Sequence, residues 1–544
     1  MTTDPIAADL AALFPAREAI PAEHRPQAAA YERLYLLDGR VRAWEGPLAE
    51  VPAAFSVREG DALVRPVVGR VPAMDEAAVL AALESCRRAW DEGRGDWPTR
   101  SVAERIAAVE KFTARMREAR EEVVRLLMWE IGKTLEDSRK EFDRTVEYIG
   151  RTVEALKAMD RDYSRFAVDG GVVAQVRRAP LGVVLSMGPF NYPLNETYTT
   201  LLPALIMGNV VLVKPPRLGS LIHQPLLQAF AESFPPGVVN FIYGSGPEIT
   251  PPLMQSGAVD VLAFIGSSKA ATTLKKQHPR PHRLRGVLGL DAKNPALVMA
   301  DADLDVAVRE CVSGALSYNG QRCTALKILF VHESVAGPFL EKFSAAVAAL
   351  PLGMPWEPGA RITPLPGHGK AEAMAAYVRD AVERGARVVN PGGGQAAASL
   401  FRPAVLYPVA PGMKVYDVEQ FGPVVPVCPY KDEEEFLAYV TASSSGQQVS
   451  LFGRDAEKIA GLIDLLANQV CRINLNAQCQ RGPDTLPFAG RKDSAEGTLS
   501  ISAALRSFSI RSLVAGKDDP EGRGLLQQIV AGRLSRYLRA DYLG

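Results

Sequence analysis

The sequence predicts an α/β protein built on a parallel β-sheet. Four short runs of apolar, mostly β-branched residues recur between residues 182 and 265, and longer helical patterns separate them. Strands that alternate with helices pair in parallel, because each helix returns the chain across the sheet. The runs are almost continuously apolar, which is typical of strands covered by helices on both faces. They span Gly182–Met187, Val210–Val213, Val238–Tyr243 and Val259–Ile265.

The flanking segments extend this organisation. A helical pattern from Asp75 to about Met159 precedes the sheet, and Asp169-Gly-Gly between alternating runs predicts a β-hairpin. A second strand–helix region runs from about Leu297 to Asn476, and a β-rich run at Ser507–Val514 precedes a charged tail. The strand-like runs of this second region are Ile328–Val331, Arg387–Val389, Pro423–Val427 and Val449–Phe452.

Composition excludes several classes of protein. The 544 residues are 47% hydrophobic and 23% charged, which excludes a disordered chain and predicts two to four domains. Lys+Arg and Asp+Glu both number 62, so nucleic acid and anionic membranes are not expected partners. No apolar run reaches the ~18 residues that a membrane helix needs. The Met-Thr-Thr-Asp start has no signal-peptide pattern, and six cysteines without a CxxC pair predict reduced thiols, no zinc site and a cytoplasmic protein.

Polar and small residues follow the predicted strands of the first sheet. Parallel sheets bind ligands at the carboxyl ends of their strands. Asn191 follows the first strand and offers an amide to an oxyanion, while Lys214 and Arg217 follow the second and suit a ribose or phosphate. Gly266 and Ser267 follow the fourth strand and open a helix, whose N-terminus is a natural phosphate site. No GxGxxG motif occurs in this region.

Cys323 is the candidate nucleophile among the six cysteines. It lies in Asn319-Gly-Gln-Arg-Cys-Thr, where Gly320 lets the backbone turn and Arg322 brings a positive charge next to the thiol. A neighbouring cation lowers a thiol pKa and increases the thiolate fraction, so we expect Arg322 to activate Cys323. Most cysteines are small buried hydrophobes, which is the alternative for this one.

These motifs together resemble those of the aldehyde dehydrogenase superfamily over roughly residues 35–515. The matching segments, in order, are Gly188-Pro-Phe-Asn-Tyr-Pro, Gly208-Asn-Val-Val-Leu-Val-Lys-Pro, Phe264-Ile-Gly-Ser, Gly320-Gln-Arg-Cys-Thr and Glu419-Gln-Phe-Gly-Pro. The resemblance implies a homodimer or homotetramer with an aldehyde dehydrogenase-like fold, made of a Rossmann-like coenzyme domain, an α/β catalytic domain and a small β oligomerisation arm. The expected divisions are an N-terminal arm at 1–30, the coenzyme domain at 31–160 and 181–288, the catalytic domain at 289–480, and the oligomerisation arm with the C-terminal tail at 161–180 and 497–544.

The resemblance also implies a mechanism. The Cys323 thiolate attacks the aldehyde carbon, and the Asn191 amide and the Cys323 backbone N–H stabilise the oxyanion. Glu419 positions the nicotinamide half of the cofactor, and Lys214 and Ser267 contact its ribose and pyrophosphate. Arg217 stands where NAD-preferring relatives carry a ribose-binding glutamate, so NADP is the expected cofactor, with NAD possible.

Within the superfamily, the chain is similar to the non-phosphorylating, NADP-dependent glyceraldehyde-3-phosphate dehydrogenases. Four residues match the phosphate-binding positions of that group: Arg144, Tyr192, Arg322 and Arg481. Guanidinium groups bind phosphate oxygens in pairs, so this set suits a phosphorylated aldehyde. The alternative for each arginine taken alone is a surface residue.

The chain departs from the superfamily pattern at the residue that activates water. The glutamate of the family's Glu-Leu-Gly-Gly-Lys motif is Gly289 here, and the phosphate-binding motif carries Ile265 and Ala271 in place of Thr and Gly. Asp291 is one candidate for the base, because residues i and i+2 share a face of a strand, although two residues displace it by ~6.6 Å. A carboxylate from elsewhere, a water relayed from the cofactor end, or a different acyl acceptor are the alternatives.

Three functions follow from these observations. The first is NADP-dependent oxidation of glyceraldehyde 3-phosphate, or a related phosphorylated aldehyde, to the acid through a Cys323 thioester. The second, motivated by Gly289, is a CoA-acylating aldehyde dehydrogenase. The third is a catalytically impaired relative that serves as a binding or structural subunit, although Cys323, Asn191 and Glu419 are all retained.

Overall fold

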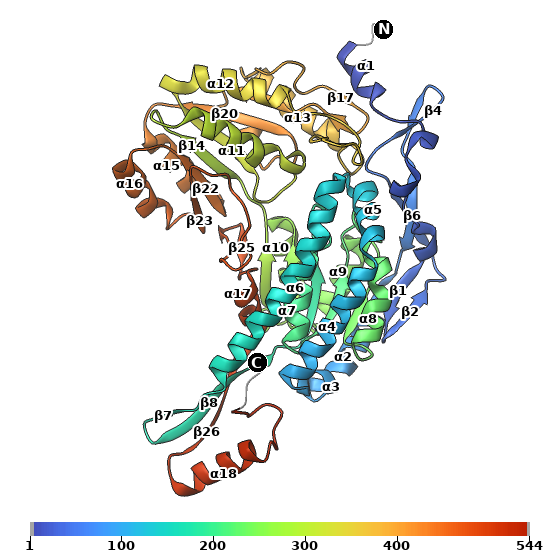
Figure 1. Ribbon diagram of the computed structural model, residues 1–544, viewed down its shortest axis with the longest axis vertical. Coiled ribbons are helices and arrows are strands. Elements are labelled where there is room, and N and C mark those ends of the chain that lie inside the picture. Colours follow the sequence, from blue (N-terminus) through green and yellow to red (C-terminus); the bar gives the residue numbers. More distant parts are fainter. Residues whose placement is uncertain (1–4, 541–544) are drawn as a thin grey trace.

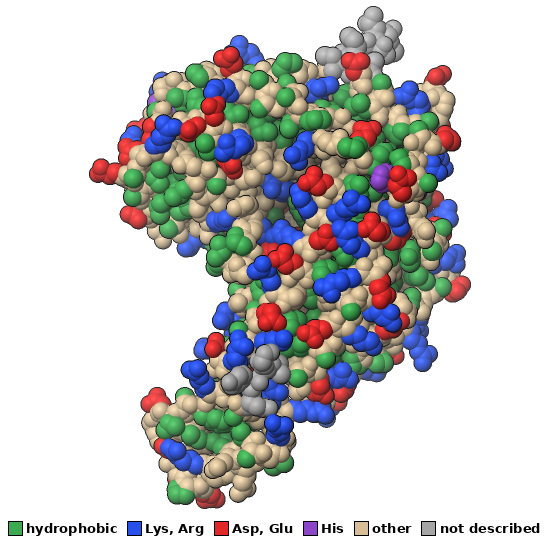
Figure 2. Space-filling view, in the orientation of Figure 1, with side chains coloured by type: hydrophobic (Ala, Val, Ile, Leu, Met, Phe, Trp, Pro, Cys, Tyr) green, Lys and Arg blue, Asp and Glu red, His purple; other side chains and the backbone are tan. Residues whose placement is uncertain are grey.

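The computed structural model describes residues 5–540, so the parts of the predicted N-terminal arm and C-terminal tail at 1–4 and 541–544 lie outside it. Figure 1 shows two α/β layers, one above the other, with a β-stranded arm that projects from the lower one. Basic and acidic side chains are interspersed over the face seen in Figure 2, in keeping with the zero net charge. Within the described residues, no helix is long and apolar enough to cross a membrane.

The first sheet confirms the predicted parallel architecture. It has eight strands in the order β2-β1-β11-β10-β9-β12-β13-β25, and the five strands from β11 to β13 run parallel. All four predicted runs form inner strands, and β1, β2, β13 and β25 are additional. The bounds are β1 Leu34–Leu37, β2 Arg40–Ala43, β9 Val183–Met187, β10 Val210–Lys214, β11 Val239–Phe241, β12 Val261–Ile265, β13 Arg285–Gly289 and β25 Ala495–Glu496.

Helices cover both faces of this sheet (Figure 1). The predicted helical region folds into α2 (Glu76–Trp90), α4 (Val102–Glu118), α5 (Arg120–Ile131) and the long α6 (Leu135–Tyr163). Between the strands lie α7 (Asn195–Ile206), α9 (Gly246–Gln255) and α10 (Ser268–Gln277). The strands β9 and β10 are buried along their whole length, as their continuous apolar sequences predict.

The second sheet has seven strands in the order β16-β19-β20-β15-β14-β22-β23. The inner strands are parallel, and β16 pairs with β19 in the antiparallel sense. The four strands predicted here are present as β15, β16, β20 and β22. The bounds are β14 Asn294–Val298, β15 Leu326–His332, β16 Arg387–Val388, β19 Ala404–Tyr407, β20 Val424–Tyr430, β22 Gln448–Phe452 and β23 Arg472–Leu475.

The arm is a three-stranded antiparallel sheet. The predicted hairpin forms from β7 (Ala167–Asp169) and β8 (Val172–Pro180), and β26 (Ser509–Lys517) pairs with β8 along its full length. Helix α18 (Pro520–Ala531) follows β26, and its Leu526 packs against Val173 and Leu538.

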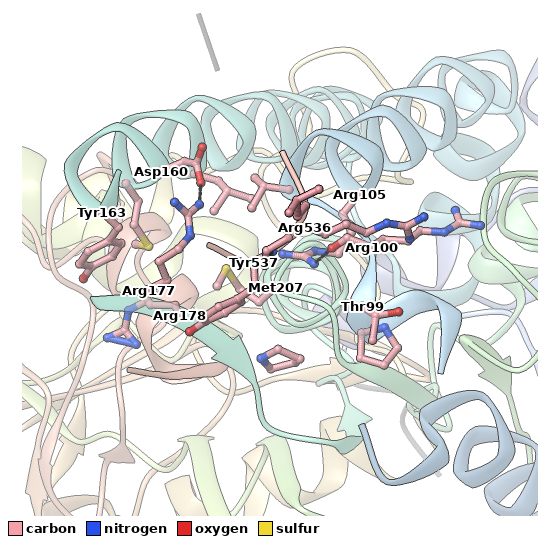
Figure 3. Close-up of a pocket in the computed structure, with 17 residues that line it drawn as sticks. Thr99, Arg100, Arg105, Asp160, Tyr163, Arg177, Arg178, Met207, Arg536 and Tyr537 are labelled. Atoms are coloured by element: carbon pink, nitrogen blue, oxygen red, sulfur yellow. Dashed lines mark hydrogen bonds and ion pairs between the residues drawn. The ribbon is translucent and has the colours of Figure 1, made fainter. Parts of the chain in front are cut away.

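A cavity of about 450 Å³ lies where the arm joins the first layer, and Figure 3 shows its residues. Arg177 and Arg539 both pair with the buried Asp160. Arg105 donates to the backbone oxygens of Arg100 and Ile206. The two ion pairs on Asp160 attach β8 and the C-terminal tail to α6, and Cys323 is not among the residues that line this cavity.

Candidate active site

A cavity of about 780 Å³ opens between the two sheets and contains Cys323. One wall includes the segments that follow β9, β10, β12 and β13, and the second sheet's half of the chain contributes Glu419 and Phe421. The predicted catalytic and cofactor residues that line it are Asn191, Arg217, Gly266, Ser267, Asp291, Cys323 and Glu419. The structure therefore brings together residues that are up to 228 positions apart in the sequence, from Asn191 to Glu419.

The segment before Cys323 has an unusual backbone. Tyr318, Asn319 and Gly320 all have positive φ, at 49°, 56° and 68°. A Cβ at Gly320 would approach the Ala315 backbone oxygen to 2.7 Å, so glycine is required there. The side chains of the other two residues hold this conformation, since the Tyr318 hydroxyl donates to Ile131 and the Asn319 amide donates to the Thr363 backbone oxygen. Backbone strain of this kind is found at sites where a reactive group must be aimed.

The Cys323 thiol is not activated by its neighbour Arg322. The pKa of Cys323 is raised to about 11, mainly by burial and then by the Glu196 and Glu419 carboxylates, against the lowering effects of Arg481 and Lys327. Arg322 points elsewhere and donates to the backbone oxygen of Gly314 at 3.0 Å. The expected low pKa of this thiol is therefore wrong, because burial outweighs the nearby cations, and the main lowering effects come from Arg481 and Lys327.

Asn191 is held in place by a buried ion pair. The Lys133 Nζ donates to the Asn191 backbone oxygen at 2.9 Å and pairs with Glu141, and both side chains have no solvent exposure. The Glu141 carboxylate also accepts from the backbone N–H groups of Leu194 and Asn195. The Asn191 side-chain amide donates to the Gln321 backbone oxygen at 2.8 Å. An amide nitrogen carries two hydrogens, so the second can serve an oxyanion next to Cys323.

Replacing Lys133 with methionine tests how much this ion pair stabilises the protein. The variant leaves Glu141 as a buried charge without its cation, which typically costs about 3–5 kcal/mol. We expect urea denaturation to show a loss of that size in the free energy of unfolding. The matched control is Lys140→Met, because Lys140 forms an exposed pair with Glu136 on the same helix. Equal, small losses in both variants would contradict the prediction.

The cofactor side of the cavity has features that suit a phosphorylated dinucleotide. Burial lowers the pKa of Lys214, the last residue of β10, to about 8, although Lys214 is not among the residues that line the cavity. Ser267 is the N-cap of α10, and a Cβ at Gly266 would lie 2.3 Å from the Phe264 ring, so only glycine fits between that ring and the cavity. Arg217 is exposed at the cavity edge. Glu419 accepts from the Ala292 backbone N–H and lies 3.5 Å from the Lys327 ammonium.

The four predicted phosphate-binding residues differ in what they contact. Arg144 forms a two-point contact with Asp484 at 2.7 and 3.0 Å, and Arg481 contacts both Asp484 and Glu196. Two arginines thus already have two carboxylate partners. The Tyr192 ring lies 3.4 Å from the Lys133 ammonium.

Gly289 stands at the position of the missing glutamate and Asp291 lies two residues after it, and the two residues have different surroundings. Gly289 lines the cavity at the last position of β13, where an added Cβ would meet Leu499 at 3.3 Å. Asp291 lies beyond the strand end, so the assumption that it shares a strand face with Gly289 does not hold. Its carboxylate accepts two hydrogen bonds at 2.7 Å, from the Ser268 backbone N–H and hydroxyl. Asp291 therefore anchors the start of α10.

Glu196 is the residue that the sequence prediction missed. It stands in the first turn of α7, is only 7% exposed and lines the cavity with Cys323. An acidic residue in the first turn of a helix is usually explained by the helix dipole. The one signal for Glu196 in the sequence is the missing carboxylate at Gly289, which indicates that a carboxylate from elsewhere in the chain takes its place.

Comparison with known proteins agrees with this geometry. Residues 61–513 match the model of the aldehyde dehydrogenase family. The chain belongs to this family. It is 33% identical over 455 residues to an NADP-dependent glyceraldehyde-3-phosphate dehydrogenase of Streptococcus equinus, which covers 81% of this chain and 91% of the relative. A relative of the same name from Apium graveolens is 30% identical over 460 residues, covering 83% and 90%.

A solved structure shares the fold as well. The NADP-dependent glyceraldehyde-3-phosphate dehydrogenase from Bacillus halodurans, crystallised in complex with NADP, superposes with a TM-score of 0.82. It is 30% identical and the match covers 90% of this chain and all of the other. The aldehyde dehydrogenase fold predicted from the motifs is therefore confirmed, and α18 lies beyond the residues that match the family model.

Proposed function

We propose that this aldehyde dehydrogenase oxidises glyceraldehyde 3-phosphate to 3-phosphoglycerate with NADP as the electron acceptor. The observation that carries the proposal is the cavity in which Cys323, Asn191, Glu419 and the start of α10 meet. Relatives named for this activity match more than four-fifths of the chain at 30–33% identity, which supports the same substrate and cofactor here. None of the cited relatives is named for CoA acylation, so that alternative is not favoured.

The chain's own residues supply the chemistry of acyl transfer. Cys323 attacks the aldehyde carbon through its thiolate and forms a hemithioacetal. The Asn191 amide and the Cys323 backbone N–H stabilise the oxyanion, and one such donor contributes typically ~3–4 kcal/mol to lowering the barrier. After oxidation, the acyl group is a thioester on Cys323, which water releases as the acid.

The residues around the cavity suit NADP. Lys214 and Arg217 would contact the 2′-phosphate side of the adenosine, and Gly266 and Ser267 at the start of α10 would contact the pyrophosphate. Glu419 would orient the nicotinamide ribose. When bound, NADP supplies the hydride acceptor. Arg144, Tyr192, Arg322 and Arg481 would receive the substrate phosphate, in which case the phosphate shares Arg144 and Arg481 with Asp484 and Glu196.

The assembly and the location of the protein belong to the same proposal. Strand β26, at the edge of the arm sheet, carries the exposed side chains of Ile510 and Leu513 on its two faces, and exposed apolar side chains of this kind are typical of a subunit interface. We therefore propose a homodimer or homotetramer, in the cytoplasm.

A panel of aldehydes tests the proposed function. Glyceraldehyde 3-phosphate, glyceraldehyde and an aliphatic aldehyde are each assayed with NADP and with NAD, in the presence and absence of CoA. We expect the highest kcat/KM for glyceraldehyde 3-phosphate with NADP, without any need for CoA. A preference for an unphosphorylated aldehyde, or a rate that depends on CoA with a thioester product, would contradict the proposal.

The low pKa of Lys214 predicts how NADP affinity depends on pH. The buried ammonium loses its proton as the pH rises through about 8, so above that pH it must regain a proton to pair with a 2′-phosphate. We expect the Kd for NADP, measured by fluorescence quenching, to increase ~10-fold for each pH unit between 8.5 and 9.5. Binding of NAD should change much less. The Lys214→Gln variant should abolish the pH dependence, and an unchanged NADP profile in that variant would refute the assignment.

A further inference from the structure

Four carboxylates line the active-site cavity, and they differ in what they contact. These are Glu196, Asp291, Asp417 and Glu419. Asp291 anchors α10 through two short hydrogen bonds from Ser268, and Glu419 is occupied by the Ala292 N–H and by Lys327. Asp417 is exposed, at the end of the short helix α14 (Lys414–Asp417). Glu196 is left as the buried carboxylate on the same side of the cavity as Asn191.

Glu196 lies close enough to Cys323 to act on its charge. Among all the charged groups around the thiol, Glu196 raises the pKa of Cys323 the most, after the effect of burial. Both side chains line the one cavity, and Asn191 stands five residues before Glu196 on the segment that Lys133 and Glu141 fix. A carboxylate that shares a cavity with the nucleophile is the type of group that serves as a general base toward water.

The neighbours of Glu196 leave one of its oxygens available. Arg481 binds Oε2, and the Asn195 amide approaches Oε1 at 3.4 Å, the outer limit of a hydrogen bond. Arg481 is itself held by Asp484 and by the Leu499 backbone oxygen, so it orients the carboxylate from behind. The side chain of Glu196 is 9% exposed, so it is largely buried but still borders the cavity.

We propose that Glu196 is the general base of acyl-enzyme hydrolysis, in place of the glutamate that Gly289 lacks. This inference rests on the proposed function. Glu196 accepts a proton from water while the water oxygen forms a bond to the thioester carbon. The C–S bond then breaks, its electron pair goes to the Cys323 sulfur, and Glu196 returns the proton to that sulfur. The carboxylic acid product leaves and ionises in solvent.

The test compares the burst and steady-state phases of NADPH formation from glyceraldehyde 3-phosphate. The step up to the thioester does not need this base, so Glu196→Gln should give a burst of one NADPH per site at close to the wild-type rate. Its steady state should fall by ~10²–10⁴-fold, the usual contribution of general-base catalysis. The control is Glu136→Gln, an exposed glutamate at the second position of α6, as Glu196 is at the second position of α7.

A carboxylate restored at residue 289 separates catalysis from structure. Gly289 has an ordinary φ, and the neighbour closest to an added Cβ is the end of the flexible Leu499 side chain. Glu196→Gln with Gly289→Glu should therefore recover at least ~10-fold of the lost steady-state rate. In addition, Glu196→Gln should alkylate faster with iodoacetamide at pH 8, because loss of the negative charge lowers the pKa of Cys323.

The outcomes distinguish this inference from the proposed function. No NADPH from wild-type protein and glyceraldehyde 3-phosphate would contradict the function itself. Wild-type turnover with an unchanged steady state in Glu196→Gln would overturn only the role of Glu196. A lower steady-state rate with an intact burst in Asp291→Asn, but not in Glu196→Gln, would assign the base to Asp291. Parallel loss of burst and steady state in Glu196→Gln, without recovery by Gly289→Glu, would show that Glu196 only supports Arg481.

Discussion

Replacing Cys323 with alanine is expected to lower NADPH formation by more than ~10³-fold, because no other group can form the thioester. Cys323 is the cysteine that lines the same cavity as Asn191, while Cys86, Cys311, Cys428 and Cys479 are buried elsewhere in the fold. NADP binding, followed by fluorescence, should be retained, since the cofactor residues come from the first sheet and from Glu419. The measurement is the steady-state rate with saturating aldehyde and NADP.

The matched control for this variant is Cys471→Ala, because Cys471 is exposed and outside the cavity. It should keep the wild-type rate. Retention of more than a few per cent of activity in Cys323→Ala would contradict the assignment of the nucleophile.

Replacing Asn191 with alanine is expected to reduce kcat by ~10²–10³-fold, with a smaller change in KM. The amide is aimed by its hydrogen bond to the Gln321 backbone oxygen, two residues before Cys323, and it stabilises charge that develops only during attack. Its loss should therefore affect the transition state more than the bound aldehyde.

A separate reaction tests whether the site remains intact in this variant. Alkylation of Cys323 by iodoacetamide forms no oxyanion, so Asn191→Ala should still be alkylated at a rate near that of the wild type. If alkylation and oxidation fall together, Asn191 positions the cysteine loop rather than the oxyanion.

The parts of the fold that could be predicted from the sequence are those with local signals. Strands β9, β10 and β12 are buried on both faces, so their apolar runs identify them. Strand β14 was not predicted, because it begins with Asn294 and Pro295, and these residue types are rare in strands. Strand β1 lies beside β2 near the sheet edge and is only partly buried, which weakens its pattern.

In the candidate site, only the residues that lie in recognisable motifs could be predicted from the sequence. Cys323 and Asn191 stand in recognisable segments, and the structure places both in one cavity. The direction of Arg322 could not be predicted, because it depends on the positive-φ turn at residues 318–320. Glu196 contacts Arg481 across 285 residues of sequence, and no local pattern reports such a contact.

The most direct measurement is mass spectrometry of the protein quenched during turnover. Acid quenching within the burst of a reaction with glyceraldehyde 3-phosphate and NADP should trap a 3-phosphoglyceroyl group on the peptide that contains Cys323, in part of the wild-type chains. The trapped fraction should rise toward one group per chain in Glu196→Gln, in step with one equivalent of NADPH, because the acyl group leaves more slowly. NADPH formation without an adduct in either protein, or an adduct on another residue, would contradict the central claim that oxidation proceeds through a thioester on Cys323.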